Sequence, residues 1–255
     1  TWLPQMNGVV RSLLTSATLL SKSGHTTATC KPSDFRTITF PLYPEYPLAW
    51  NLREKYLHQH FVPRCIVHIA TEGPLGFAVR RYCVKHNIPF TTSYHTNFPA
   101  YFKRYIRLPE FLMYAYLRWF HRASKAVMVS TSTMEKTLQE HGFERIRRWS
   151  KGVDTQFFRP LPHERATPPL CLYVGRIAKE KNIEAFLECK NNVQKCLIGD
   201  GPHRAYLQKK YPHAKFLGWM EQEELTQAYA QADCFVFPSK TDTFGLVLLE
   251  ALASG

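Results

Sequence analysis

The 255-residue sequence lacks several patterns that would assign it to a common class. No apolar run reaches the roughly 20 residues that a membrane-spanning helix requires, and no signal peptide, internal repeat or low-complexity segment is visible. The cysteines form no CxxC pair, which argues against a zinc ribbon or a dithiol redox centre. We therefore expect a cytoplasmic protein whose cysteines are reduced and mostly buried. The seven cysteines are Cys30, Cys65, Cys83, Cys171, Cys189, Cys196 and Cys234.

Acidic residues are scarce in one part of the chain only. Residues 1–151 contain 21 Lys and Arg against 8 Asp and Glu, whereas residues 152–255 contain 12 of each kind. The whole net charge of +13 therefore belongs to the first part. Such a basic region favours an anionic partner, which by charge alone could be nucleic acid, a membrane surface or a phosphorylated substrate.

Short apolar runs alternate with segments of helical spacing along the whole chain. Strands are predicted at residues 66–70, 90–94, 126–130, 146–149, 170–174, 196–198, 215–217 and 234–237, with helices between most of them. Before residue 66 we expect a helix at 9–21, strands at 26–30 and 37–40, a proline-broken loop at 41–47 and a helix at 48–60.

This alternation predicts an α/β fold with two doubly wound, Rossmann-like domains that face a cleft. We place the first domain at residues 1–151, a proline-rich linker at 152–169 and the second domain at 170–255. The chain begins with Thr rather than Met, has no strand before its first helix, and stops as its last helix ends. We therefore expect a first domain without its first strand and an unfinished second domain.

Three loops of the second domain follow strand ends, as a binding cleft requires. Residues 175–182 (GRIAKEKN) offer the guanidinium of Arg176 and the ammonium of Lys181, which together suit a pyrophosphate. Residues 199–202 (GDGP) form a tight turn, whose glycines either serve the turn alone or let a ligand approach the backbone. In residues 241–255, Glu250 stands within an apolar helix, where it either turns to solvent or holds a polar group.

These stretches together resemble the nucleotide-sugar domain of the GT-B glycosyltransferases of family 4. The resemblance is carried by GRIAKEKN, LIGDGP, FLGWM and ADCFVFPSKTDTFGLVLLEALASG, and SKGVDTQFFRP is similar to the interdomain segment of that family. In the first half, LPQMNGVVRSL, VHIATEGPLG and TTSYHTNFPAYF resemble the bacterial branch that transfers mannose or a related sugar to lipid acceptors.

The resemblance implies a role for each matching residue. It implies that Arg176, Lys181 and Gly8 contact the donor diphosphate, that Glu250 binds the ribose, and that Asp242 and His95 lie beside the reacting sugar. Asp242 is one methylene shorter than the glutamate usual at that position. Backbone groups of the donor site would come from Phe244, Gly245 and Leu246, and acceptor contacts from Asn7 and Glu72. Glu72 could equally be an ordinary loop acid.

No cofactor is expected, because the nucleotide sugar is a co-substrate. The sequence has no Asp-x-Asp pair, so no metal site is expected either. Residues 101–123 interleave aromatic and basic residues in the manner of an interfacial membrane helix, although most of these aromatics could also belong to the core.

The expected function is a retaining glycosyltransferase that transfers a hexose, mannose from GDP-mannose in the first instance, to a lipid or lipid-linked acceptor. We expect it at the cytoplasmic face of the membrane, held there by its basic first domain, with no nucleic-acid partner. Three alternatives stay open: a UDP-sugar-dependent transferase, a nucleotide-sugar epimerase of the same architecture, and a non-catalytic module that binds anions or membranes.

Overall fold

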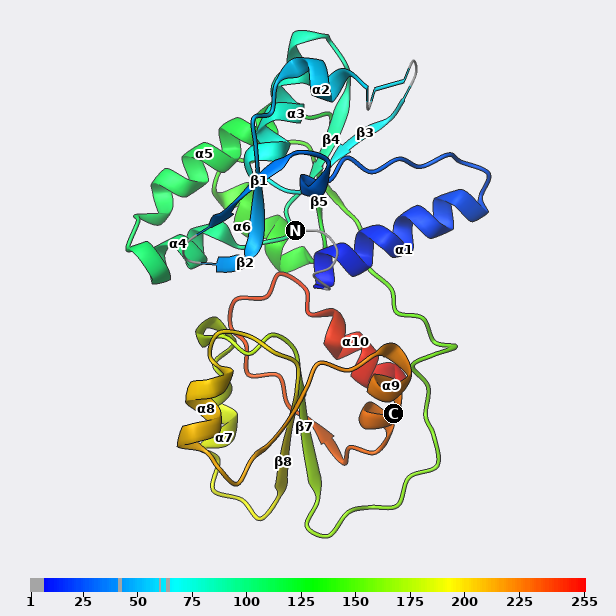
Figure 1. The fold of residues 1–255 in the computed structure, drawn as a ribbon, viewed down its shortest axis with the longest axis vertical. Coiled ribbons are helices and arrows are strands. Elements are labelled where there is room, and N and C mark those ends of the chain that lie inside the picture. Colours follow the sequence, from blue (N-terminus) through cyan, green and yellow to red (C-terminus); the bar gives the residue numbers. More distant parts are fainter. Residues whose placement is uncertain (1–6, 41–42, 60, 63–64) are drawn as a thin grey trace. The chain divides into compact units, whose positions relative to one another are not determined.

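The computed structural model describes residues 7–40, 43–59, 61–62 and 65–255, which form two compact units, Thr1–Lys151 and Gly152–Gly255 (Figure 1). Each unit contains a four-stranded parallel sheet with helices packed on it. The predicted α/β fold with Rossmann-like parallel sheets is thus confirmed. No helix in the described part of the chain is long and apolar enough to cross a bilayer.

The sheet of unit 1 follows the chain in a single direction, in the order β3-β4-β5-β6. Its strands are Val67–Ile69, Phe90–Ser93, Val127–Val129 and Ile146–Arg148, and the connecting helices are α3 (Pro74–Lys85), α4 (Phe98–Ile106), α5 (Glu110–Arg122) and α6 (Ser132–Glu140). Helices α4 and α5 separate where predicted, at Pro109, because proline disfavours helical geometry in the residue before it. Thr131 begins α6 by accepting a hydrogen bond from the Met134 amide at 3.2 Å.

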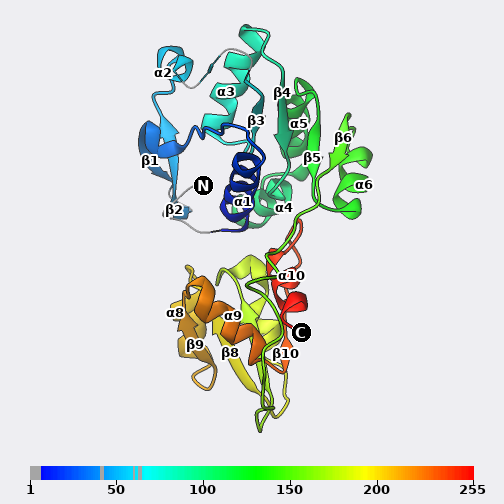
Figure 2. The same cartoon turned by 90° about the vertical axis from the view of Figure 1, so that its right-hand side faces the viewer.

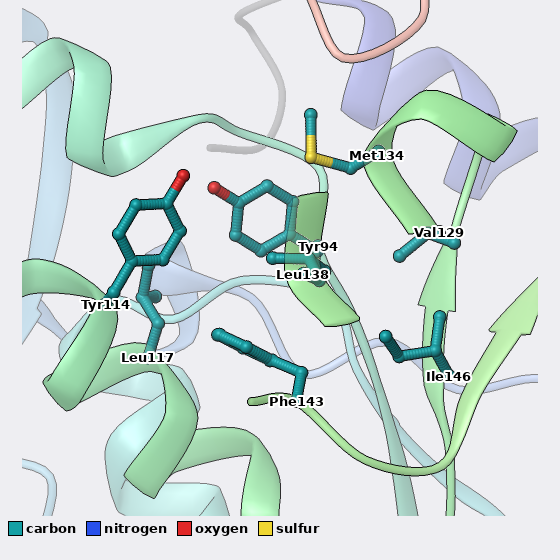
Figure 3. Packing of buried hydrophobic residues seen from close by; sticks show 8 residues of the cluster. All are labelled: Tyr94, Tyr114, Leu117, Val129, Met134, Leu138, Phe143 and Ile146. Carbon is teal, nitrogen blue, oxygen red and sulfur yellow. The ribbon is translucent and has the colours of Figure 1, made fainter. Parts of the chain in front are cut away.

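The core of unit 1 lies on one face of this sheet. The register pairs Ile69 with Thr92, Thr92 with Val127, and Val127 with Ile146, so these residues share a face. Helices α5 and α6 close over that face with Leu117 and Leu138, among other side chains. Figure 3 shows this cluster of Tyr94, Tyr114, Leu117, Val129, Met134, Leu138, Phe143 and Ile146.

The segment before β3 differs from its prediction. Helix α1 (Gly8–Lys22) is confirmed, but residues 26–30 form no strand, and a single 3-10 turn, η1 (Pro32–Asp34), precedes β1 (Arg36–Phe40). The predicted loop at 41–47 is wrong from Tyr43 onward, and residues 41–42 lie outside the described part. Strand β2 (Tyr43–Trp50) pairs antiparallel with β1, and only α2 (Glu54–His58) remains of the helix predicted at 48–60.

Unit 2 has helices on both faces of its sheet. Its strands are β7 (Leu170–Val174), β8 (Gln194–Ile198), β9 (Lys215–Gly218) and β10 (Cys234–Phe235). Leu197 and Tyr173 pack against α7 (Ile183–Leu187) and α8 (Arg204–Lys210). The alternate residues Leu172 and Ile198 pack against α9 (Gln222–Ala230) and α10 (Leu246–Ala253), and Figures 1 and 2 show the two helix pairs on opposite sides.

The cysteines bear out their prediction in part. All seven are free, as expected, but Cys83, Cys171 and Cys196 alone are buried, whereas Cys189 and Cys234 are exposed. Cys189 stands between Glu188 and Lys190 just after α7, and Cys234 begins the short strand β10.

Candidate functional site

The winding of the unit 2 sheet reverses between β7 and β10. Strands β7, β8 and β9 advance across the sheet in one direction, and the chain then crosses back to place β10 beside β7, in the order β10-β7-β8-β9. In open α/β sheets, ligands bind beyond the carboxyl ends of the strands at such a reversal. The loops that leave these two ends are residues 175–182, one of the three stretches named from the sequence, and 236–245, which runs into a second of them, 241–255.

Lys181 and Asp242 meet at this reversal, although 61 residues separate them. The Lys181 Nζ lies 2.7 Å from Asp242 Oδ1 and 2.8 Å from Oδ2. The two side chains are 12% and 25% exposed, so the ion pair is only partly screened by water. Lys181 Nζ also lies 5.9 Å from the centre of the Phe237 ring. The residue predicted to bind the donor diphosphate, Lys181, therefore contacts the residue predicted to face the donor sugar, Asp242.

Arg176 is held by a carboxylate that sequence reasoning missed. Its Nη1 lies 3.3 Å from Oε1 of Glu180, whose side chain is only 1% exposed. The Tyr173 hydroxyl also donates to the Arg176 carbonyl oxygen at 2.9 Å, which fixes the start of the loop. The signal available in the sequence was the four-residue spacing of opposite charges, a spacing that brings side chains together on helical turns.

The glycines of the GDGP turn serve the packing of two loops against each other. A Cβ on Gly199 would lie 2.1 Å from the carbonyl oxygen of Gly175, and one on Gly201 would lie 2.4 Å from that of Ile177. The Ile177 amide donates to the Asp200 carbonyl oxygen at 2.9 Å across the same contact. On the side where a Cβ would stand, each glycine is thus needed for the packing of the chain's own backbone, and ligand approach to the turn stays a prediction.

Helix α10 begins at the same reversal. Gly245 is its N-cap residue, no side chain caps it, and its first turn contains no acidic residue. The positive end of the helix dipole is therefore not offset within the helix itself, which favours a nearby anion. Phe244, Gly245 and Leu246 are half-buried at this helix start, and their backbone contacts with a donor stay a prediction.

Glu250 is buried and bonded to a residue of the neighbouring helix. It is 2% exposed, and its Oε2 accepts a hydrogen bond from the Tyr229 hydroxyl of α9 at 2.9 Å. Of the two possibilities that the sequence left open, Glu250 holds a polar group rather than turning to solvent. Contact with a ribose stays a prediction.

His95 follows β4 in unit 1 and is enclosed by aromatic and basic neighbours. Its ring centre lies 5.9 Å from that of Trp149, and it is buried. Burial, followed by the positive charge of Lys151, lowers the pKa of His95 from 6.5 to about 3. The imidazole is therefore neutral at physiological pH, and its role beside the sugar stays a prediction.

The two acceptor-side candidates are placed differently. Glu72 is not an ordinary loop acid, because it is buried and its Oε1 lies 3.3 Å from Nε2 of the buried His121. His121 Nδ1 lies 2.8 Å from the Thr92 hydroxyl, so a buried polar network connects Glu72 through His121 of α5 to Thr92 of β4. Asn7 begins α1, and its Oδ1 accepts from the amides of Val9 at 3.0 Å and Val10 at 3.1 Å.

Gly8 is the exposed first residue of α1, directly after that cap. The first turn of α1 contains no acidic residue. An anion could therefore approach the start of this helix, and the predicted diphosphate contact of Gly8 remains untested. Among the described residues, no group of three or more His, Cys, Asp or Glu is placed to hold a metal ion.

Two family models together match nearly the whole chain. Residues 6–157 match the family described as Glycosyltransferase Family 4, and residues 168–255 match Glycosyl transferases group 1. The chain belongs to glycosyltransferase family 4. This membership confirms the resemblance drawn from the motifs, and it does not favour an epimerase or a non-catalytic module.

Individual relatives of this family 4 chain agree. A GDP-mannose-dependent alpha-mannosyltransferase of Mycobacterium tuberculosis is 31% identical over 285 residues, which cover all of this chain and 75% of that protein. A sulfoquinovosyl transferase of Arabidopsis thaliana is 32% identical over 244 residues, which cover 86% of this chain. The chain spans 47% of the length of that plant relative.

Among solved structures, a sucrose-phosphate synthase from Thermosynechococcus elongatus is similar with a TM-score of 0.67 at 21% identity. The match covers 79% of this chain and 56% of that protein. At this level of identity, the similarity concerns the fold of the family 4 chain alone.

Proposed function

We propose that the protein is a retaining glycosyltransferase that transfers a hexose, mannose from GDP-mannose in the first instance, to a lipid or lipid-linked acceptor at the cytoplasmic face of the membrane. The observation that carries this proposal is the contact of Lys181 with Asp242 where the β7 and β10 loops meet. Cleavage of a sugar–phosphate bond is favoured by a cation that stabilises the leaving diphosphate, and a carboxylate can orient the sugar hydroxyls; Lys181 and Asp242 would supply these two groups.

The leaving diphosphate gains negative charge as the sugar–phosphate bond breaks. Arg176, Lys181 and the start of α10 are the groups in unit 2 that would stabilise this charge. Glu180 helps because it fixes the direction of the Arg176 guanidinium before a donor arrives. A guanidinium held in place loses little conformational freedom when it binds phosphate oxygens.

The ion pair suggests how donor binding prepares the sugar site. A diphosphate would compete with Asp242 for Lys181, because both are anions that require the same Nζ. Once Lys181 turns to the phosphates, the Asp242 carboxylate is released to accept hydrogen bonds from sugar hydroxyls. The shorter side chain of aspartate then limits how far this carboxylate reaches.

His95 would act on the sugar as a neutral group. Its lowered pKa leaves one ring nitrogen as a donor and the other as an acceptor, so it can orient hydroxyls without adding charge. This suits a reaction in which the sugar carbon becomes positively charged, since a cationic imidazole would oppose that charge. We assign no covalent nucleophile for the retention step.

GDP-mannose is proposed because the mycobacterial relative, which matches the entire chain, is named for that donor. A lipid acceptor is proposed because the excess positive charge lies in unit 1, and a basic unit would be attracted to an anionic membrane surface that carries such an acceptor. A UDP-sugar is the alternative donor, and the experiment below includes it.

The test is a transfer assay with radiolabelled GDP-mannose, GDP-glucose, UDP-glucose and UDP-galactose, each with and without a membrane lipid extract and with EDTA. We expect label from GDP-mannose in the lipid phase, only when extract is present and equally in EDTA. Conversion of the donor sugar without extract would indicate an epimerase instead. Absence of nucleotide release from every donor would refute the proposal.

A further inference from the structure

A hollow of about 550 Å³ lies in unit 1 on the outer side of α3. It runs along the face of α3 turned away from Val79 and Cys83, which are buried in the core, and the segment from β2 to α2 closes its other side. Its position differs from that of the loops at the β7–β10 reversal, which belong to unit 2. The residues that define its chemistry are Trp50, Arg53, Leu57, Phe77, Arg81 and Tyr82.

The hollow has a buried apolar floor and an exposed apolar rim. Leu57 and Tyr82 are buried at its base, and Phe61 stacks on Tyr82 with ring centres 4.5 Å apart. Trp50 and Phe77 stand at the rim, 62% and 41% exposed. Two large rings exposed beside a hollow indicate an interaction surface, because soluble proteins rarely leave such apolar area uncovered.

The same aromatic surface continues onto α5. The rings of Phe77 and Trp119 have centres 5.9 Å apart, and the Arg80 guanidinium lies 3.9 Å from the centre of the Trp119 ring. Trp119 is itself exposed, as are Phe111 and Leu112 on the same helix. Tryptophan and arginine side by side are typical of proteins that lie at a membrane interface.

The cations of the hollow differ in what neutralises them. Lys85 donates to both oxygens of Glu54, at 2.9 and 2.7 Å, and His86 lies 2.7 Å from the same carboxylate. Within the described part of the chain, the side chains of Arg53 and Arg81 have no carboxylate partner. Glu54, which also lines the hollow, is thus shared by Lys85 and His86, and the guanidinium groups of Arg53 and Arg81 form no ion pair with it.

We propose that this hollow binds one anionic phospholipid of the membrane, with its phosphate on Arg53 and Arg81 and its acyl chain along Trp50 and Phe77. Guanidinium groups match phosphate oxygens, and the apolar floor suits a hydrocarbon chain. Nucleic acid would satisfy the arginines but would leave Trp50, Leu57 and Phe77 without an apolar partner. The inference rests on the membrane association in the proposed function, and it adds a lipid site that is separate from the donor loops.

The experiment is sedimentation of the protein with sucrose-loaded vesicles of phosphatidylcholine containing 30% phosphatidylglycerol, or of phosphatidylcholine alone. The Arg53→Gln/Arg81→Gln variant is compared with Lys125→Gln/Lys136→Gln, which removes two exposed charges of unit 1 outside the hollow. Because each basic residue at an anionic surface contributes on the order of a fivefold gain, we expect a roughly 30-fold fall in binding for the arginine variant. We expect less than about a threefold fall for the lysine variant.

A second readout shows whether a chain occupies the hollow. Phosphatidylglycerol brominated on its acyl chains should quench tryptophan emission in the wild type, and the quenching should fall in Trp50→Phe. An equal loss of binding in both charge variants, unchanged quenching in Trp50→Phe, or equal affinity for a DNA duplex would overturn the proposal. GDP binding by calorimetry should be the same in every variant, which separates failure of this proposal from failure of the donor site.

Discussion

The two units use polar groups in opposite ways. In unit 2, the two cations predicted to contact the donor diphosphate are partly exposed and paired with carboxylates, Lys181 with Asp242 and Arg176 with Glu180. In unit 1, His95 and Glu72 are enclosed, and His95 is kept neutral by burial and by Lys151. The difference suggests that the cations of unit 2 are placed to bind an anionic ligand, whereas His95 and Glu72 of unit 1 contribute uncharged or buried hydrogen-bonding groups.

The charges of the two units follow the same division. Unit 2 has as many acidic as basic residues, so its cations are matched by acids within the unit. Unit 1 has a large excess of cations, and some of them, such as Arg53 and Arg81, lie beside exposed aromatic rings. A ligand that competes for paired cations should act on unit 2, and a surface that neutralises unpaired cations should act on unit 1.

The largest effect expected in this comparison is on the folding of unit 2. In Gly201→Ala, the new Cβ would lie 2.4 Å from the Ile177 carbonyl oxygen, so the two loops must separate. We expect a loss of about 3 kcal/mol in the free energy of unfolding, since overpacking a closed contact costs roughly that amount. Thermal denaturation followed by circular dichroism should show a fall in the Tm of unit 2 on the order of 15 °C.

Gly152→Ala is the matched control for this change, because a Cβ there meets nothing within 4 Å. Its Tm should equal that of the wild type. Equal Tm values for Gly201→Ala and Gly152→Ala would show that the loops are not packed as described.

Lys181→Ala should have the next largest effect, on donor use. The change leaves diphosphate charge uncompensated, and a charged hydrogen bond contributes roughly 1.5–3 kcal/mol, so we expect about a 10- to 100-fold loss in kcat/KM for the nucleotide sugar. Lys190→Ala removes an exposed lysine of the same unit and should leave the kinetics unchanged. Similar values for the two variants would remove Lys181 from the site.

The acid sensitivity of unit 1 should depend on His95. Its pKa is about 3 in the folded chain and near 6.5 when unfolded, so the unfolded state binds more protons between these values. The contribution of the neutral imidazole to stability is full above pH 6.5 and is lost progressively as the pH falls toward 3. In His95→Gln, urea unfolding followed by tryptophan fluorescence should therefore lose less stability between pH 7 and pH 5 than in the wild type.

His25→Gln provides the comparison for that measurement, because His25 is exposed in the same unit. It should retain the full pH dependence of the wild type. A His95→Gln variant with that same pH dependence would show that His95 is not kept neutral by the fold.

Asp242→Asn is expected to have the smallest effect, and one of opposite sign. Removal of the carboxylate frees Lys181 for the diphosphate, so GDP should bind more tightly, by about fivefold at most, since partly exposed ion pairs contribute no more than about 1 kcal/mol. Transfer of the sugar should slow in the same variant. Weaker GDP binding measured by calorimetry would contradict the competition between Asp242 and the diphosphate.

Much of the fold could be predicted from the sequence, because buried parallel strands are short apolar runs that end at polar loops. Strand β2 was missed because Pro44 and Pro47 break its pattern, although proline is tolerated in a two-stranded ribbon that has free edges on both sides. Burial at the hollow beside α3 was also not predictable, since it arises where β2, α2 and α3 meet.

The candidate site could be predicted as a set of residues but not as a set of contacts. Lys181 and Asp242 were selected separately, and their pairing follows only from the reversal that places β10 beside β7. The partners Glu180, Tyr229 and His121 were missed because each acts through burial, which depends on elements distant in the sequence. The glycines of GDGP were selected for a special backbone, but their neighbour proved to be another loop.

Amide hydrogen exchange in the presence of GDP tests most directly the claim that the β7–β10 reversal is the donor site. We expect slower exchange on GDP addition at residues 176–182 and 241–248, and no change along α3 beside the hollow of unit 1. Protection that is absent from both loops, or that appears along α3 instead, would contradict it.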